Sequence, residues 1–158
     1  MKYCLFSLIL LFSFAASAQF SVGGRTASFD ASHANWSFSV SKNSDNRVTI
    51  EALANLESGW HIFSAEPGGD GSLTPTAFEV DQLASLKVAI EATEKGNAIK
   101  KEMDGIGSVK YYEHRAVFSI TFAAPQQLKT FSGKINFQVC NDVMCMAPTA
   151  KSFSVTLK

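Results

Sequence analysis

The chain has 158 residues, which is enough for one domain of ordinary size. Lys plus Arg number 14 and Asp plus Glu number 14, so the formal net charge is zero. A nucleic-acid-binding domain or a polybasic membrane-surface protein would need a basic face, and this balance argues against both. Hydrophobic residues make up 46% and charged residues 18%, which is too apolar for a disordered chain.

The first 18 residues have the pattern of a Sec signal peptide. Met1 and Lys2 give a basic start, residues 4–14 are apolar apart from two serines, and residues 15–18 are the small residues that signal peptidase reads. The apolar run is short for a membrane span, which needs about 20 residues. We therefore expect cleavage after Ala18, a mature domain of residues 19–158, and export to the periplasm with no membrane span in the mature chain.

Short alternating apolar runs follow one another along the mature chain. Apolar side chains recur at every second position, within runs that are listed here in chain order: residues 36–40, 48–54, 116–122, 135–139 and 153–157. Turn-forming residues separate the runs, at residues 42–46, 67–72, 124–125 and 132–133. Many short alternating strands with polar turns predict an all-β fold of the sandwich or barrel type.

One stretch fits two structures. Residues 78–93 are rich in Ala, Leu and Glu and could form a helix. Residues 76–80 and 86–90 also fit two strands joined by a turn at residues 82–85. The pattern alone leaves both structures open, and an all-β sandwich accommodates either.

The cysteines are the most informative residues of the chain. Cys4 lies in the signal peptide, so the mature chain keeps Cys140 and Cys145 in a C-x4-C spacing. Cys140 follows an alternating strand, and residues 141–144 fit a four-residue hairpin loop. Antiparallel neighbours are about 4.5–5.5 Å apart at Cα, which suits a disulfide, and an exported protein meets an oxidising compartment.

Three roles are open for this pair. A structural disulfide across a loop of roughly six residues stabilises by about 2 kcal/mol in the chain-entropy model, which is the weak end of the range. A short-loop pair is better suited to opening and closing in thiol–disulfide exchange. Copper(I) could also use the two thiolates with Met144 and Met146, whereas C-x4-C without a second pair is a weak zinc signal. The redox role is preferred, with no metal and no cofactor expected.

Three segments together resemble the N-terminal periplasmic domain of the thiol:disulfide interchange protein DsbD. They are the cysteine motif of residues 139–148 (VCNDVMCMAP), the aromatic strand and turn of residues 59–64 and 67–69, and the segment of residues 100–106 with 109–112. The similarity extends over roughly residues 28–157. It implies an immunoglobulin-like β-sandwich, with strands rather than a helix in residues 76–92.

The resemblance also implies a function. In that family the exposed cysteine pair takes electrons from a thioredoxin-like domain fed by a membrane segment, and then reduces periplasmic isomerases and related partners. This chain ends at Lys158 with no such segments, so we expect a separate membrane protein as electron donor and thioredoxin-like proteins as partners. A non-catalytic exported interaction module with a structural disulfide is the alternative.

The motif departs from that of the best-known members, which have one more residue between the cysteines and a second proline after them. Trp60, His61 and Phe63 replace a tyrosine-rich strand, and Ile106 replaces an aromatic residue of the cap over the active site. His61 could hydrogen-bond a sulfur or shuttle its proton, or it could be a partly exposed strand histidine.

The expected site therefore combines the cysteine pair with its surroundings. Its predicted members are Cys140 and Cys145 as the redox pair, with His61, Phe63, Asp104, Ile106 and Asp142 around them. Cys145 follows the loop and precedes Pro148, so its sulfur should be the more exposed one. We expect Cys145 to form the mixed disulfide with partners and Cys140 to resolve it.

Overall fold

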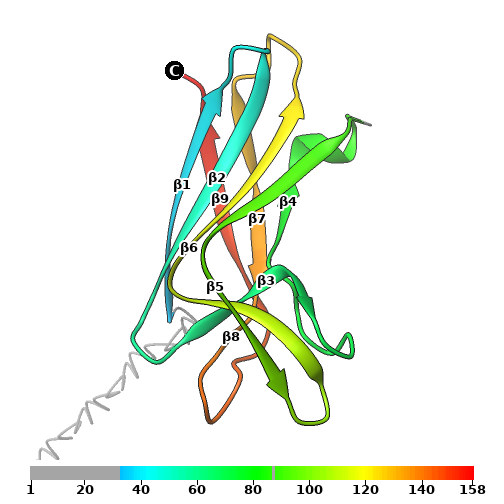
Figure 1. Ribbon diagram of the computed structural model, residues 1–158. Helices are drawn as coiled ribbons and strands as arrows, with labels where there is room; N and C mark the ends of the chain where they lie inside the picture. Colours follow the sequence, from blue (N-terminus) through cyan, green and yellow to red (C-terminus); the bar gives the residue numbers. More distant parts are fainter. Residues whose placement is uncertain (1–32, 87) are drawn as a thin grey trace, which may run out of the picture.

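The computed structural model describes residues 33–86 and 88–158, and the predicted signal peptide of residues 1–18 lies outside this range. Within the described residues, nine strands and one 3-10 helix follow one another (Figure 1). They are β1 (Ala34–Lys42), β2 (Arg47–Leu56), β3 (His61–Gly68), β4 (Ala77–Val80), η1 (Asp81–Ala84), β5 (Ile90–Met103), β6 (Gly107–Ala123), β7 (Thr130–Phe137), β8 (Val139–Cys140) and β9 (Thr149–Thr156). The prediction of an all-β fold is confirmed.

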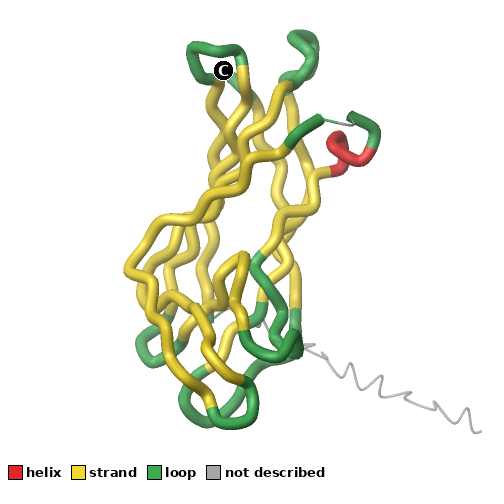
Figure 2. Tube along the Cα trace, turned by 45° about the vertical axis from the view of Figure 1, so that its right-hand side comes forward, coloured by secondary structure: helices red, strands yellow, loops and turns green. Residues whose placement is uncertain are grey.

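The strands form two antiparallel sheets that pack face to face. In the described part of the chain, the first sheet has the order β1-β2-β6-β3-β8, with β5 on the other edge of β6, and the second has the order β4-β7-β9. Figure 1 shows the second sheet behind the first, and Figure 2 shows the two layers running along the length of the molecule. The architecture is an immunoglobulin-like β-sandwich.

The alternating runs bury one face of each strand between the sheets. In β2, for example, Val48, Ile50, Ala52 and Ala54 are buried while the residues between them are only partly buried. Two of the buried clusters lie between the sheets. Their largest buried members are Trp36, Ile62, Tyr112, Phe118 and Phe137 in the first and Ile50, Phe122, Phe131 and Phe153 in the second. Apolar side chains at alternate strand positions, buried between the two sheets, therefore stabilise the sandwich.

The predicted turn at residues 132–133 is wrong, because these residues lie inside β7. Gly133 pairs with Val80 of β4. A Cβ atom at Gly133 would overlap the carbonyl oxygen of Glu79, so this glycine permits a close approach of two backbones instead of a reversal of the chain.

The run of residues 135–139, expected as one strand leading into Cys140, is divided between the two sheets. β7 ends at Phe137 in the second sheet, and β8 begins at Val139 in the first. The residue between them, Gln138, is held at both ends of its amide: it accepts a hydrogen bond from the backbone of Thr74 (3.3 Å) and donates one to the carbonyl of Met146 (3.1 Å). The cysteine pair therefore follows a crossing of the chain from one sheet to the other.

Among its described residues, the stretch of residues 78–93 contains no long helix and only the first of the two expected strands. β4 covers the first expected strand, and the short helix η1 follows it directly. The expected strand at residues 86–90 is wrong apart from its last residue, since β5 starts at Ile90. Leu83 and Val88 of this connection pack against the second core cluster, which explains why an irregular segment is so apolar.

The β5–β6 hairpin bends halfway along its length. The pairing of the two strands shifts between Gly96 and Ala98, and His114 on the facing part of β6 adopts a positive φ of 61°. A Cβ atom at Gly96 would lie 2.9 Å from the ring of Tyr112 and from the carbonyl of Arg115, so only glycine fits the bulge. Beyond the bend, the hairpin reaches the end of the molecule that carries the cysteine loop (Figure 1).

Candidate redox site

The register of three neighbouring strands gives β3 two different faces. Ile62 of β3 lies opposite Tyr112 of β6 on one side and opposite Val139 of β8 on the other. All three side chains are buried in the first core cluster. Because successive side chains of a strand point to opposite faces, the residues on either side of Ile62 must lie on the outer face of the sheet.

That outer face carries the cysteine pair. His61 lies opposite Cys140, and Phe63 lies opposite Tyr111. Phe63, Tyr111 and Cys140 belong to a third buried cluster, which also contains Val109. The candidate site is thus built on the back of the same three strands whose front forms the core.

Cys140 and Cys145 form a disulfide with a Cα–Cα distance of 4.0 Å, and the two residues also pair as an antiparallel bridge. The expected four-residue hairpin loop is present. Asn141 stabilises it, because its side-chain oxygen accepts hydrogen bonds from the backbone of Val143 (2.9 Å) and of Met144 (2.8 Å). This turn role of Asn141 was not predicted, although Asn is a common residue for such side-chain-to-backbone turns.

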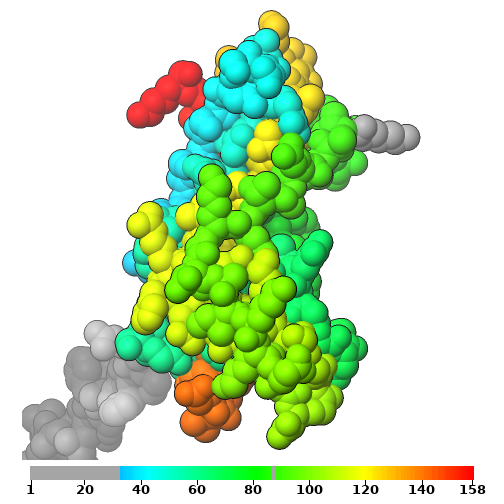
Figure 3. Space-filling view, in the orientation of Figure 1, coloured from blue at the N-terminus to red at the C-terminus, as the bar shows by residue number. Residues whose placement is uncertain are grey.

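The two cysteines differ in accessibility. Cys140 is only 2% exposed, whereas Cys145 is exposed. The loop between them presents Val143 and Met144 to solvent, with exposed fractions of 90% and 53%. Figure 3 shows this loop (orange) projecting at one end of the molecule, the end that also carries the tip of the β5–β6 hairpin. An incoming group therefore has direct access to Cys145 and not to Cys140.

The tip of the β5–β6 hairpin covers the buried cysteine, and we call residues 99–106 the cap. Ile99, Met103 and Ile106 of the cap pack against the cluster that contains Phe63 and Cys140. The turn of residues 67–69 supports the cap from the side: Gly69 donates a backbone hydrogen bond of 3.0 Å to the carbonyl of Ser108. A Cβ atom at Gly69 would lie 2.9 Å from Cγ2 of Ile106, so the close contact requires glycine.

A pocket of about 320 Å³ lies between the cap and the cysteine loop. Its lining includes, besides both cysteines, the predicted residues His61, Phe63, Ile106 and Asp142. Asp104 is exposed in the turn of the hairpin and does not line the pocket. Sequence reasoning missed Leu73, Lys101, Met103 and Tyr111 as lining residues. Lys101, Met103 and Tyr111 reach the pocket through long-range strand pairing, and Leu73 reaches it from the loop between β3 and β4.

His61 is a buried titratable residue of this site, and its pKa is lowered. It is 7% exposed, which excludes the expectation of a partly exposed strand histidine. Burial holds the pKa of His61 below its ordinary value of 6.5, against the opposing pull of the carboxylates of Glu113 and Asp142, while Lys101 adds to the lowering. The ring packs 4.4 Å from that of Tyr111, centroid to centroid.

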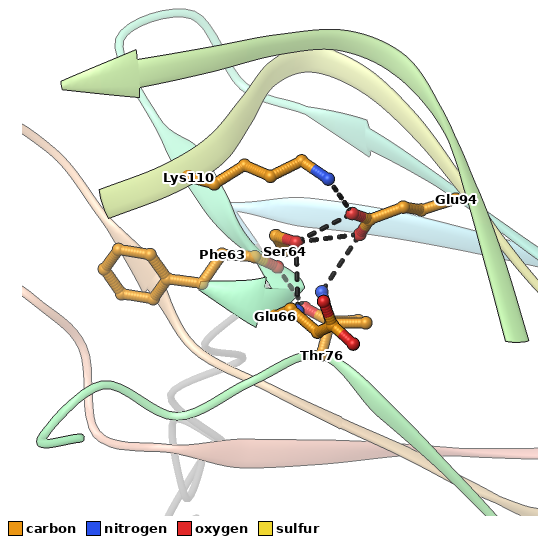
Figure 4. Close-up of polar contacts among 7 residues, drawn as sticks. Phe63, Ser64, Glu66, Thr76, Glu94 and Lys110 are labelled. Atoms are coloured by element: carbon orange, nitrogen blue, oxygen red, sulfur yellow. Dashed lines mark hydrogen bonds and ion pairs between the residues drawn. The ribbon is translucent and has the colours of Figure 1, made fainter. Parts of the chain in front are cut away.

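A polar network fixes β3 directly after Phe63 (Figure 4). Ser64 donates a hydrogen bond of 2.8 Å to the carboxylate of Glu94, which also accepts one of 3.0 Å from the backbone of Ala65 and pairs with Lys110. Although burial raises the pKa of Glu94, the hydrogen bonds from Lys110, Ala65 and Ser64 outweigh it and hold the pKa below its ordinary value of 4.5.

The hydroxyl of Thr76 donates a hydrogen bond of 2.6 Å to the carbonyl of Phe63. In Figure 4 the ring of Phe63 points away from this network. The pairing of β3 with β6 shifts between Phe63 and Gly68. The strand therefore lacks regular backbone hydrogen bonds to β6 at the residues that the network holds. The network therefore replaces the sheet as the support that positions Phe63 against the cysteine pair.

Among the described residues, no three or more His, Cys, Asp and Glu side chains converge on a point where a metal ion could be held. No helix in that part of the chain is long and apolar enough to cross a membrane.

These features define an immunoglobulin-like sandwich with a short-loop disulfide that joins one exposed and one buried cysteine. The family model described as "Thiol:disulfide interchange protein DsbD, N-terminal" matches residues 27–157, and the chain belongs to this family. The family suggested by the sequence motifs is therefore confirmed. No curated protein matches the sequence.

Two solved structures share the fold. The chain is similar to the N-terminal domain of DsbD from Neisseria meningitidis in the reduced form, with a TM-score of 0.57 and 13% identity over 78% of this chain and 85% of that one. It is also similar to the N-terminal periplasmic domain of ScsB from Proteus mirabilis, with a TM-score of 0.55 and 20% identity over 77% of this chain. The match covers only 44% of the ScsB chain.

Proposed function

We propose that this protein is a periplasmic dithiol carrier that passes reducing equivalents between thioredoxin-like proteins through Cys140 and Cys145. The observation that carries the proposal is the unequal exposure of the two bonded cysteines: Cys145 is an exposed residue, while Cys140 is buried in the cluster against which the cap packs. A disulfide that served only as a staple would gain nothing from such a cover. Its entropic contribution, about 2 kcal/mol for so short a loop, would also be small for a domain of this size.

The exchange follows from this geometry. In the oxidised protein, a thiolate of the electron donor attacks the sulfur of Cys145, a bond forms between these two sulfurs, and the Cys140–Cys145 bond breaks with its electron pair on Cys140. A second donor thiolate then displaces Cys145 and leaves the dithiol. In the reduced protein, Cys145 attacks the disulfide of an acceptor, and Cys140 displaces the reduced acceptor by closing the internal disulfide.

The proposed partners are proteins with an apolar surface beside their own cysteines. Val143 and Met144 flank Cys145 and are the large apolar side chains most exposed at this end of the described chain. A thioredoxin-like acceptor that buried them would bring its disulfide to Cys145. We propose a membrane protein as the donor, in line with the family and with the periplasmic location named for the ScsB domain.

Trapping with single-cysteine variants tests the proposal. Cys140→Ser should accumulate covalent complexes with thioredoxin-like periplasmic proteins, because a mixed disulfide at Cys145 can no longer be resolved. Cys145→Ser is the matched control and should trap none. If neither variant forms a complex, and the reduction potential of the wild-type pair lies below about −300 mV, the disulfide is structural and the alternative of a non-catalytic exported module replaces this proposal.

A further inference from the structure

Three side chains form a row across the outer face of the sheet. His61 of β3 lies directly opposite Glu113 of β6 and directly opposite Cys140 of β8. Directly opposed residues of antiparallel strands point to the same face, with Cβ atoms about 4.5–5.5 Å apart. His61 is therefore placed between Glu113 on one side and Cys140 on the other.

His61 has an unsatisfied atom in this row. Its Nε2 atom is buried and has no hydrogen-bond partner among the described residues. Leaving a buried polar atom unpaired is unfavourable, so such an atom in a native structure needs an explanation. A disulfide has no hydrogen to donate, whereas a cysteine thiol does. Reduction of the pair would create the missing donor at Cys140.

We propose that His61 is the general base that removes the thiol proton of Cys140 when Cys140 resolves a mixed disulfide at Cys145, and that Glu113 holds the imidazole for this task. The inference rests on the proposed function. The proton of Cys140 passes to Nε2 of His61, and the Cys140 thiolate attacks the sulfur of Cys145. The internal disulfide forms, and the bond from Cys145 to the partner breaks with its electron pair on the partner's sulfur.

The surroundings give the step its physical reason. Cys140 is covered, and burial disfavours a free thiolate, so a base that acts at the moment of attack lowers the barrier. Because burial lowers the pKa of His61, the ring is neutral and able to accept a proton at neutral pH. The charged groups that face the ring are Glu113 from β6, Asp142 from the cysteine loop and Lys101 from β5. The two carboxylates stabilise the imidazolium formed in the step.

Reaction of the reduced protein with one equivalent of the chromogenic disulfide dithionitrobenzoate separates the two half-reactions. Attack by Cys145 releases the first thionitrobenzoate at a rate that depends on reagent concentration. Resolution by Cys140 releases the second thionitrobenzoate at a rate that does not depend on reagent concentration. We expect His61→Gln to slow the second release about tenfold or more at pH 7, a conservative figure for loss of a general base, while the first changes less than about twofold.

The pH profile distinguishes a base from a packing residue. For the wild type, the second rate should level off above the pKa of His61, which lies below 6.5. For His61→Gln it should rise about tenfold per pH unit from pH 5 to 8, as expected when only the thiolate formed in solution reacts. Glu113→Gln keeps the ring but removes its carboxylate, so the plateau should move to lower pH and the plateau rate should fall.

His114→Asn is the matched control, because His114 is an exposed histidine of β6 at a positive φ that asparagine tolerates. It should leave both rates unchanged. An unaltered second rate and pH profile in His61→Gln would overturn the inference, and if that variant did not fold, an unshifted plateau in Glu113→Gln would do the same. Partner trapping by Cys140→Ser is independent of these rates, so failure of the carrier proposal and failure of the base can be told apart.

Discussion

Truncation of Phe63 should expose the covered cysteine without unfolding the domain. Phe63 is 1% exposed and packs with Cys140 against the cap. A buried Phe→Ala change costs about 3–5 kcal/mol, and the low end applies here because the cap is a hairpin end that can partly collapse into the cavity. A loss of about 3 kcal/mol leaves a domain of this size folded.

The ring of Phe63 contacts both the sheet and the cap, so about half of the lost free energy should come from contacts that keep the cap closed. Opening then becomes easier by about 1.5 kcal/mol, which is a factor of roughly ten. In a Cys145→Ser background, where Cys140 is the remaining thiol of the mature chain, Phe63→Ala should therefore raise the rate of iodoacetamide alkylation of reduced protein about tenfold.

Phe131→Ala provides the matched control. Phe131 is equally buried, but it lies in the second core cluster, away from the cap. It should lose a similar free energy of unfolding in urea titrations and leave the alkylation rate of Cys140 unchanged. Equal acceleration by both substitutions would show that global unfolding exposes Cys140, and an unchanged rate in Phe63→Ala would show that the cap does not protect it.

Three further predictions concern stability and processing. Because folding lowers the pKa of Glu94, the stability that its carboxylate contributes is present above pH 4.5 and is lost as pH falls below that value. The unfolding free energy of the wild type should therefore fall more steeply in acid than that of Glu94→Gln, and parallel curves would contradict this. Gly133→Ala forces a Cβ against the carbonyl of Glu79 and should lower the unfolding free energy by about 1–3 kcal/mol, whereas a change under about 0.5 kcal/mol would show that β4 yields freely. Intact-mass measurement of exported protein should give a chain that starts at Gln19, and a mass that includes residues 1–18 would refute cleavage.

The sequence predicted those parts of the fold that depend on local alternation. The runs at residues 36–40 and 48–54 became β1 and β2, because one face of each is buried and period-2 patterning reports burial directly. The same signal could not reveal the change of sheet at Gln138. Both sheets bury residues in one shared core, so Phe137 and Val139 stay in phase although they belong to different sheets.

The turn predicted at residues 132–133 was wrong because a local pattern does not report a contact between distant segments. Gly133 resembles a turn in the sequence, but its role is to allow contact with a strand that lies more than 50 residues away in the chain. The surroundings of the cysteine pair were only partly predictable on the same grounds. The position of His61 opposite Cys140 depends on the register between β3 and β8, which a single sequence does not contain.

The two-faced strand β3 has a consequence for how this protein can change in evolution. Ile62 belongs to the core, and its neighbours His61 and Phe63 belong to the redox site. Deleting or inserting a single residue inside the paired part of β3 would exchange the two faces beyond that point, placing an imidazole or aromatic ring in the core and a branched aliphatic side chain under the cap. Length variation is therefore disfavoured within this part of β3, where the site can diversify by substitution at alternate positions. The cysteine loop, which ends in solvent, is free of this constraint and is the segment where relatives can differ in length.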